Sequence, residues 1–176
     1  QKNIVLNDGE LKTNQSEVNA KGKLKYRSFE DLANFNNSVR ISLDLDKTKV
    51  DPKDLKYFTD IEKIGISGVF EIDGEIRGRL SSIKAKDIIL KAGRNTVFKG
   101  DFSLNGLPKI KETFISLRVE SLKTNYSDLK YIHNKIPIPI NAKRLGQIIF
   151  KGKFDGFYSD FVTYGEIITA LGYAKT

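Results

Sequence analysis

Apolar and polar residues alternate along most of this chain with a period of two. From Val39 to Leu45, the odd positions hold Val, Ile and Leu, and the even positions hold Arg, Ser and Asp. Successive side chains of a β-strand point to opposite faces, so this pattern is typical of a strand with one buried and one wet face. It recurs over residues 98–104, 115–119 and 148–156. The alternation predicts an all-β fold built from repeated antiparallel strands.

The apolar positions of these strands share one predicted face. They are Ile41, Leu43, Leu45, Ile66, Phe70, Ile72, Phe98, Phe102, Leu104, Ile115, Leu117, Val119, Ile148, Phe150 and Phe154. Glycines lie among these large side chains, and a missing side chain lets a strand bend, so we expect curved strands. The face lines either an open apolar groove or the closed core of a β-sandwich, and the sequence leaves both open.

Helices should be short. Asp51 is a good N-cap and is followed by proline at the first helical position, which predicts a helix near 52–58. Asn125 precedes an equivalent segment and predicts a second helix near 126–133, and residues 28–35 can form another turn or two. Residues 136–140 carry two alternating prolines, so they must be extended but cannot form a central strand.

Short sequence echoes indicate an internal repeat. An apolar run closed by glycine begins at residues 4, 88 and 167. Ile-Ser-Leu at 41 and Asp-Leu-Lys-Tyr at 54 both recur 74 residues later (115 − 41 and 128 − 54), and Ile72-Asp-Gly74 resembles Phe154-Asp-Gly156. We therefore expect a first β-repeat unit over 1–87, and a second unit with the start of a third over 88–176. Stacked repeats present long surfaces rather than one pocket, and we expect a fragment of a longer array.

The chain is basic, with 30 Lys and Arg against 22 Asp and Glu, a net charge of +8. This excess indicates an anionic neighbour such as nucleic acid, phospholipid headgroups or an acidic glycan. The clearest basic feature comprises Lys21, Lys23, Lys25 and Arg27, which share one face at strand spacing. These cations either contact an anionic surface or form a wet face that discourages edge pairing.

The residues of common catalytic and metal sites are missing. The chain has no cysteine, which excludes disulfides and thiolate metal sites and fits a reducing cytoplasm or a bacterial periplasm. His133 is the only histidine, so we expect it at the surface or a helix end, and we expect no enzyme, no metal and no cofactor. The aromatic residues lack interleaved cations on their own face, so nucleic acid is not an expected partner.

The glycine-rich strands and short helices resemble those of one protein family. The closing stretch reads Gly152-Lys-Phe-Asp-Gly156, then Asp160-Phe161, Gly165, Thr169 and Gly172, and Leu145-Gly146 and Asp128-Leu129 precede it. The earlier unit offers Gly68, Gly74 and Gly78, then Gly93-Arg-Asn-Thr96 and Leu104-Asn-Gly-Leu107. From about Asp51 onward, this pattern resembles TamB-like proteins of the AsmA-like group of bacterial envelope proteins, most closely their Bacteroidota branch.

The resemblance implies a curled, taco-like β-groove with an apolar interior. It implies a periplasmic protein anchored in the inner membrane by a helix absent here and reaching the outer membrane. It also implies phospholipid transport between the membranes, outer-membrane barrel assembly, or both. The implied partners are phospholipid acyl chains and a TamA-like outer-membrane β-barrel. The family pattern does not require the charge of +8, and it offers no catalytic residues to carry over.

Two other function classes stay open at the sequence level. The chain could be an extracytoplasmic β-sandwich repeat that binds a glycan or a protein. A nucleic-acid binder or an unrecognised enzyme forms a third class, which a salt-dependent shift with DNA would favour.

Overall fold

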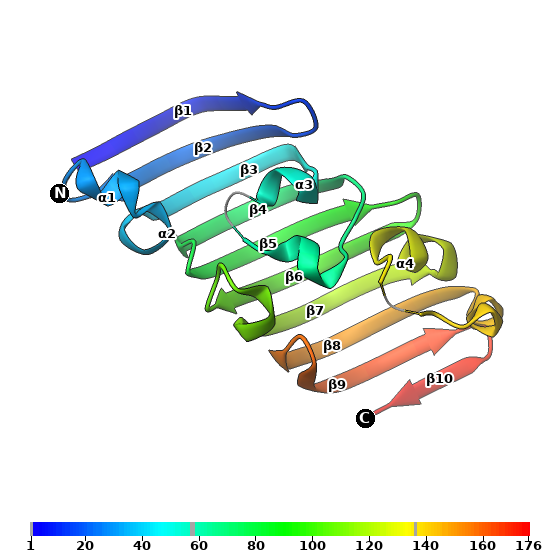
Figure 1. The fold of residues 1–176 in the computed structure, drawn as a ribbon. Coiled ribbons are helices and arrows are strands. Elements are labelled where there is room, and N and C mark those ends of the chain that lie inside the picture. Colours follow the sequence, from blue (N-terminus) through cyan, green and yellow to red (C-terminus); the bar gives the residue numbers. More distant parts are fainter. Residues whose placement is uncertain (1, 57–58, 136) are drawn as a thin grey trace.

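The structure, a computed structural model, describes residues 2–56, 59–135 and 137–176. Within these residues, ten strands form one open antiparallel sheet in which neighbours in the chain are neighbours in the sheet (Figure 1). They are β1 (Lys2–Lys12), β2 (Glu17–Tyr26), β3 (Arg40–Val50), β4 (Phe70–Arg79), β5 (Ser82–Ala92), β6 (Thr96–Asn105), β7 (Phe114–Asn125), β8 (Gln147–Phe157), β9 (Asp160–Thr169) and β10 (Gly172–Lys175). The sheet does not close into a barrel, and the all-β prediction is confirmed.

The helices are short, as expected, and lie in the connections between strands. They are α1 (Glu30–Ala33), α2 (Phe35–Ser38), α3 (Pro52–Leu55) and α4 (Tyr126–Ile132), with 3-10 turns η1 (Ile61–Ile64), η2 (Ile110–Glu112) and η3 (Ile140–Leu145). The Asp51 side chain caps α3 by accepting from the Lys53 backbone N–H at 2.9 Å. Residues 57, 58 and 136, on which parts of our predictions fall, lie outside the described residues.

The strand register assigns each side chain to a face, because cross-strand partners lie on the same side of a sheet. Ile41 pairs with Gly78, and Ile115 pairs with both Leu104 and Gly156. Followed across all strands, these pairings place every predicted lining residue on one face except Ile66. We call this face the apolar face and its opposite the polar face.

The strand expected around Ile66 was wrong. Ile66 lies in the β3–β4 connection, where it forms an isolated bridge with His133. Gly65 and Gly68 flank it with positive φ of 76° and 84°, so the chain turns here instead of running straight into β4. The sequence period continued through this turn, but the backbone did not.

The strands bend because their pairing shifts near the middle. Each neighbouring pair from β1–β2 to β7–β8 contains a register irregularity, whereas β8–β9 and β9–β10 do not. Such bulges kink a strand and increase its twist. Gly100 lies at one of them with φ of 148°, and a Cβ there would lie 2.0 Å from the Arg118 carbonyl oxygen. Glycine is therefore required for this close strand approach, as the interrupted apolar face predicted.

The connections cover much of the apolar face. Leu32 of α1 and Phe35 of α2 pack against a buried cluster that contains Ile41 and Ile83. At the centre of the sheet, Ile88 is only 1% exposed, although a single layer cannot bury a side chain of its own face. Figure 1 shows helices α1 to α4 on the same side of the sheet. The fold is thus a sheet with a partial second layer made of its own connections.

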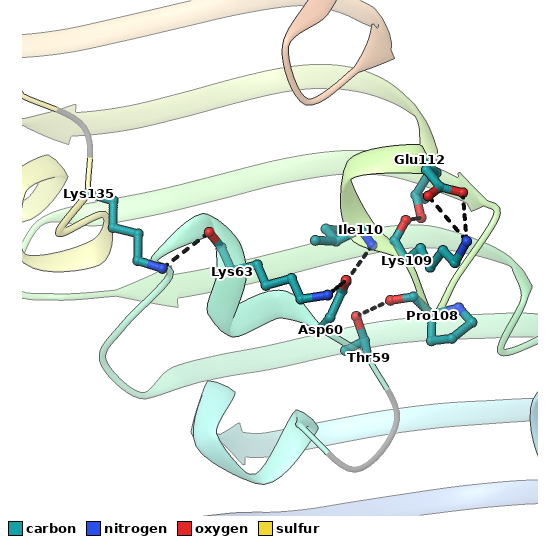
Figure 2. Close-up of polar contacts among 9 residues, drawn as sticks. Thr59, Asp60, Lys63, Pro108, Lys109, Ile110, Glu112 and Lys135 are labelled. Atoms are coloured by element: carbon teal, nitrogen blue, oxygen red, sulfur yellow. Dashed lines mark hydrogen bonds and ion pairs between the residues drawn. The ribbon is translucent and has the colours of Figure 1, made fainter.

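One segment, residues 59–68, crosses this second layer, and we call it the strap. Asp60 Oδ1 accepts from the Ile110 backbone N–H at 2.7 Å, and Thr59 Oγ1 donates to the Pro108 carbonyl at 3.0 Å (Figure 2). At its other end, the Ser67 backbone N–H donates to the Ile132 carbonyl at 2.8 Å. The strap therefore joins the η2 connection to the end of α4.

The repeat exists at the level of strands, with a period of four. The copies that begin at residues 4, 88 and 167 lie in β1, β5 and β9. Register corrects one echo: Gly78 pairs with Ile41 as Gly156 pairs with Ile115, so Gly156 corresponds to Gly78 and not to Gly74. Residues 87 and 88, where we divided the two units, lie inside β5. The division into units 1–87 and 88–176 stays a prediction.

An aspartate in each unit ties a short helix to the preceding hairpin. Asp54 in α3 accepts hydrogen bonds from Thr13 Oγ1 at 2.6 Å and Ser16 Oγ at 2.5 Å, both in the β1–β2 turn. Asp128 in α4 accepts from the Asn95 backbone N–H at 2.6 Å, in the β5–β6 turn. Each aspartate lies three residues after its N-cap. The matching contacts give the 74-residue echo a structural reason.

Asp128 is the more buried of the two, at 4% exposure. Burial raises the pKa of this carboxyl. Hydrogen bonds from the Asn95 and Arg94 backbone N–H groups and from Thr96 lower the pKa by more than burial raises it, so the pKa lies below its ordinary value. Gly93 in the same turn has φ of 61°, and a Cβ there would lie 2.8 Å from Asp128 Cγ. The turn is therefore fitted closely to the carboxylate.

We expect Asp128→Asn to lower the free energy of unfolding by about 1.5–3 kcal/mol, because a charge-assisted acceptor for several donors is lost. Urea unfolding at neutral pH measures the change. Asp54→Asn is the matched control, and its effect should be smaller because its carboxylate is half-buried. Equal effects of the two substitutions would contradict the role of burial.

The contribution of Asp128 should also depend on pH. Because its pKa is lower in the folded chain than in the unfolded one, its stabilisation is fully present above the unfolded value of about 3.8 and is lost as the pH falls through the folded value. Unfolding free energies measured from neutral pH into the acid range should therefore converge for the parent chain and Asp128→Asn. A constant difference across this range would show that the carboxylate charge does not stabilise the fold.

Candidate functional site: the two faces of the sheet

Apart from Ile66, the predicted lining residues lie together on the apolar face, but their surroundings differ along the sheet. Ile41 is 8% exposed and Val119 is 5% exposed, and the others are half-buried. Across β2 to β7 the connections and the strap pack over this face. There the structure favours a closed core rather than an open groove.

The apolar face becomes uncovered at its C-terminal end. Phe161 of β9 is 51% exposed, and its ring stacks on Phe154 of β8 with centroids 4.6 Å apart. Ile167 lies on the same face, opposite Phe150, and is 38% exposed. We call Phe150, Phe154, Phe161 and Ile167 the open apolar patch. It continues the buried core outward to the edge of the sheet.

The alternating pattern did not predict Phe161 and Ile167 as lining residues. The reason is that β9 does not alternate: Val162, Tyr164 and Ile168 lie on its other face, between the apolar-face positions. These three side chains are 50–60% exposed, and Tyr173 of β10, opposite Ile168, is 82% exposed. A strand with apolar residues on both faces is typical of one that is covered on both sides.

The basic stretch of β2 is arranged partly as predicted. Lys21, Lys23 and Lys25 lie on the polar face, and Lys21 forms an ion pair with Asp8 at 3.1 Å. Arg27 does not share their strand face, because β2 ends at Tyr26. The Arg27 backbone N–H instead donates a hydrogen bond to Asp31 Oδ2 at 2.6 Å. The alternating pattern in the sequence continues for one residue, Arg27, beyond the end of the strand.

His133 lies next to an aromatic residue at the end of α4. Its Nε2 is 3.1 Å from the Tyr158 hydroxyl, and the two rings are stacked. Burial lowers the pKa of this imidazole below its ordinary value. Among the described residues, no three metal-binding side chains come together. No helix among residues 2–56, 59–135 and 137–176 has the length and apolar character to cross a membrane.

No protein-family model, curated protein or solved structure matches this chain. The function proposed below therefore rests on the geometry of the two faces and on the sequence resemblance stated above.

We expect a carboxylate to destabilise the fold much more in the covered part of the apolar face than in the uncovered part. Leu43 packs against the buried cluster, so Leu43→Asp should lower the free energy of unfolding by at least about 3 kcal/mol. Phe161→Asp should lower it by no more than about 1.5 kcal/mol, because the new charge reaches water and the main loss is the stacking contact with Phe154. Thermal and urea unfolding measure both variants. A stable Leu43→Asp chain would show that the connections do not close this face.

Proposed function

We propose that this chain is a segment of a periplasm-spanning β-sheet protein of the TamB-like kind. Its function would be to carry phospholipid between the inner and outer membranes, to support outer-membrane barrel assembly, or both. The observation that carries the proposal is the open apolar patch: a one-sided apolar sheet face that emerges from its cover at β8 and β9, beside an unclosed sheet edge.

The physical chemistry of a lipid fits this end of the sheet. An acyl chain gains about 0.8 kcal/mol for each CH2 group removed from water, and the patch offers aromatic and aliphatic surface for that contact. The headgroup would stay in solvent beside the exposed side chains of Phe161 and Ile167, because the cover of the apolar face does not reach them. Covered acyl chains and a wet headgroup are the two requirements of a lipid-carrying groove.

The proposal places lipid contact on β8 and β9 rather than along the whole sheet. Over β3 to β7 the strap and the short helices already fill the apolar face, and Asp60 and Thr59 attach the strap to the η2 connection. This covered part would act as a rigid spacer within a longer sheet. The periplasmic location and a TamA-like barrel partner follow from the same resemblance and form part of the proposal.

A second candidate function, a glycan- or protein-binding module, is favoured by a different observation. Val162, Tyr164 and Tyr173 are exposed on the polar face of β9 and β10, where a lipid groove needs only a wet surface. Exposed tyrosines beside an apolar residue are typical of a protein interface. The two candidates thus use opposite faces of the same hairpin.

The two faces can be separated by matched substitutions in one strand. We expect the parent chain to bind a fluorescent fatty acid, and Phe161→Asp with Ile167→Asp to weaken this binding at least about tenfold, because acyl contact is lost. Tyr164→Asp is the control, since it puts the same charge on the opposite face of β9 and should leave binding unchanged. Mass spectrometry of lipid extracted from the purified chains gives an independent measure.

Two outcomes would reject the lipid proposal. One is a parent chain that binds neither the fatty acid nor extractable lipid. The other is an equal loss of binding in Tyr164→Asp, which would show that the apolar patch has no special role. Unfolding measurements on each variant must first show that the fold is retained, as the small change expected for Phe161→Asp predicts.

A further inference from the structure

A hollow of about 550 Å³ on the polar face of β2 to β5 gathers an unusual density of positive charge. Its charged lining residues are Lys25, Arg40, Arg77, Arg79 and Lys84, and Ser42 and Ser82 add two hydroxyl groups. No carboxylate and no aromatic ring is among the lining residues within the described part of the chain. Only Lys25 belongs to the basic stretch that the sequence analysis singled out.

The sheet register places these cations directly against one another. Lys25 of β2 pairs with Arg40 of β3, and Arg77 of β4 pairs with Lys84 of β5. Directly opposite residues have Cβ atoms about 5 Å apart, and like charges at that spacing destabilise a sheet. Two such pairs on adjacent strands repel each other in the absence of an anion. A bound anion would remove this repulsion.

Most of these cations form no ion pair within the described part of the chain. Arg77 forms an ion pair with Glu75 at 2.8 Å and donates to Ser42 Oγ at 3.0 Å. In contrast, Lys25, Arg40, Arg79 and Lys84 form no ion pair with any residue that the structure describes.

One donor in the hollow is also unsatisfied. The Nε atom of Arg79 is buried and has no hydrogen-bond partner among the described residues. A buried donor without an acceptor is unfavourable, so the Arg79 side chain would gain by turning its Nε towards an acceptor such as a ligand oxygen.

A neighbouring hollow on the same face differs because carboxylates lie among its cations. It has a volume of about 420 Å³ and shares Lys84, but Asp101 and Asp155 lie among its cations. There Arg118 lies opposite Asp101 on one side and Lys153 on the other. The absence of carboxylates is therefore a property of the first hollow and not of the whole face.

We propose that the hollow of Lys25, Arg40, Arg77, Arg79 and Lys84 binds a phosphate group, the chemistry shared by a phospholipid headgroup and a free phosphate. Arginine donors match phosphate oxygens in a forked geometry, and lysines add point charges. Without an aromatic ring the hollow cannot stack a base, so single-stranded nucleic acid fits it poorly. The hollow lies on the face opposite the open apolar patch. The phosphate proposal therefore does not rest on the proposed lipid function.

The test compares two pairs of substitutions that remove the same charge from the same face. Inorganic phosphate is titrated at constant ionic strength while the amide resonances of Gly78 and Ser82 are followed by NMR. We expect Arg40→Gln with Lys84→Gln to weaken binding at least about tenfold, because two charge-assisted contacts are lost. Arg118→Gln with Lys153→Gln is the matched control and should bind as the parent does.

Vesicles distinguish the two sources of the phosphate group. Binding to phosphatidylglycerol vesicles that depends on Arg40 and Lys84, together with binding of inorganic phosphate, supports the proposal with a headgroup as ligand. Binding of inorganic phosphate without vesicle binding supports it with a free phosphate. The proposal is overturned if neither probe binds the parent chain. It is also overturned if both double variants lose binding equally, or if duplex DNA alone binds in a manner that depends on Arg40 and Lys84.

Discussion

A sheet of one layer exposes its apolar face unless something covers it, and this constraint shapes the whole molecule. In most β-proteins a second sheet provides the cover. Here the segments that join the strands do so, because several of them are long enough to return over the face. Val39 and Ile88, at 0% and 1% exposure, show how complete the cover is where the connections reach. Where they stop, at β8 and β9, the same apolar face is open to solvent.

The helices within these connections are too short to be stable by themselves, so the connections need fixed contacts to remain on the sheet. Three aspartates supply such contacts. Asp54 and Asp128 fasten α3 and α4 to the preceding hairpin turns, and Asp60 fastens the strap to η2. In each case a carboxylate accepts a hydrogen bond from a backbone N–H or hydroxyl of another connection or turn. The polar contacts of the second layer therefore hold the apolar cover in place.

The two faces of the sheet lead to two independent functional ideas. The apolar face offers an uncovered end for acyl chains, whereas the polar face offers a basic hollow for a phosphate group. Because side chains on opposite faces do not meet, substitutions on one face need not disturb the other. A segment with both surfaces would hold two separate ligands, and the hollow gathers five of the 30 cations of the chain without a carboxylate among its lining residues.

Alternation determined the all-β class and the common face of Ile41, Leu43, Ile115 and Leu117, and the caps determined the short helices after Asp51 and Asn125, because these features depend on local periods and caps. The sequence also showed the echoes of a repeat, but not the strand register, so Gly156 was matched with Gly74 instead of Gly78. It could not predict whether the apolar face was open, because packing of the strap over β3 to β7 depends on contacts between residues about 50 positions apart, such as Asp60 and Ile110. The basic hollow was also invisible, since Lys25, Arg40, Arg79 and Lys84 come from four strands. Only strand pairing brings these charges together, because register is set by the whole sheet and not by any one segment.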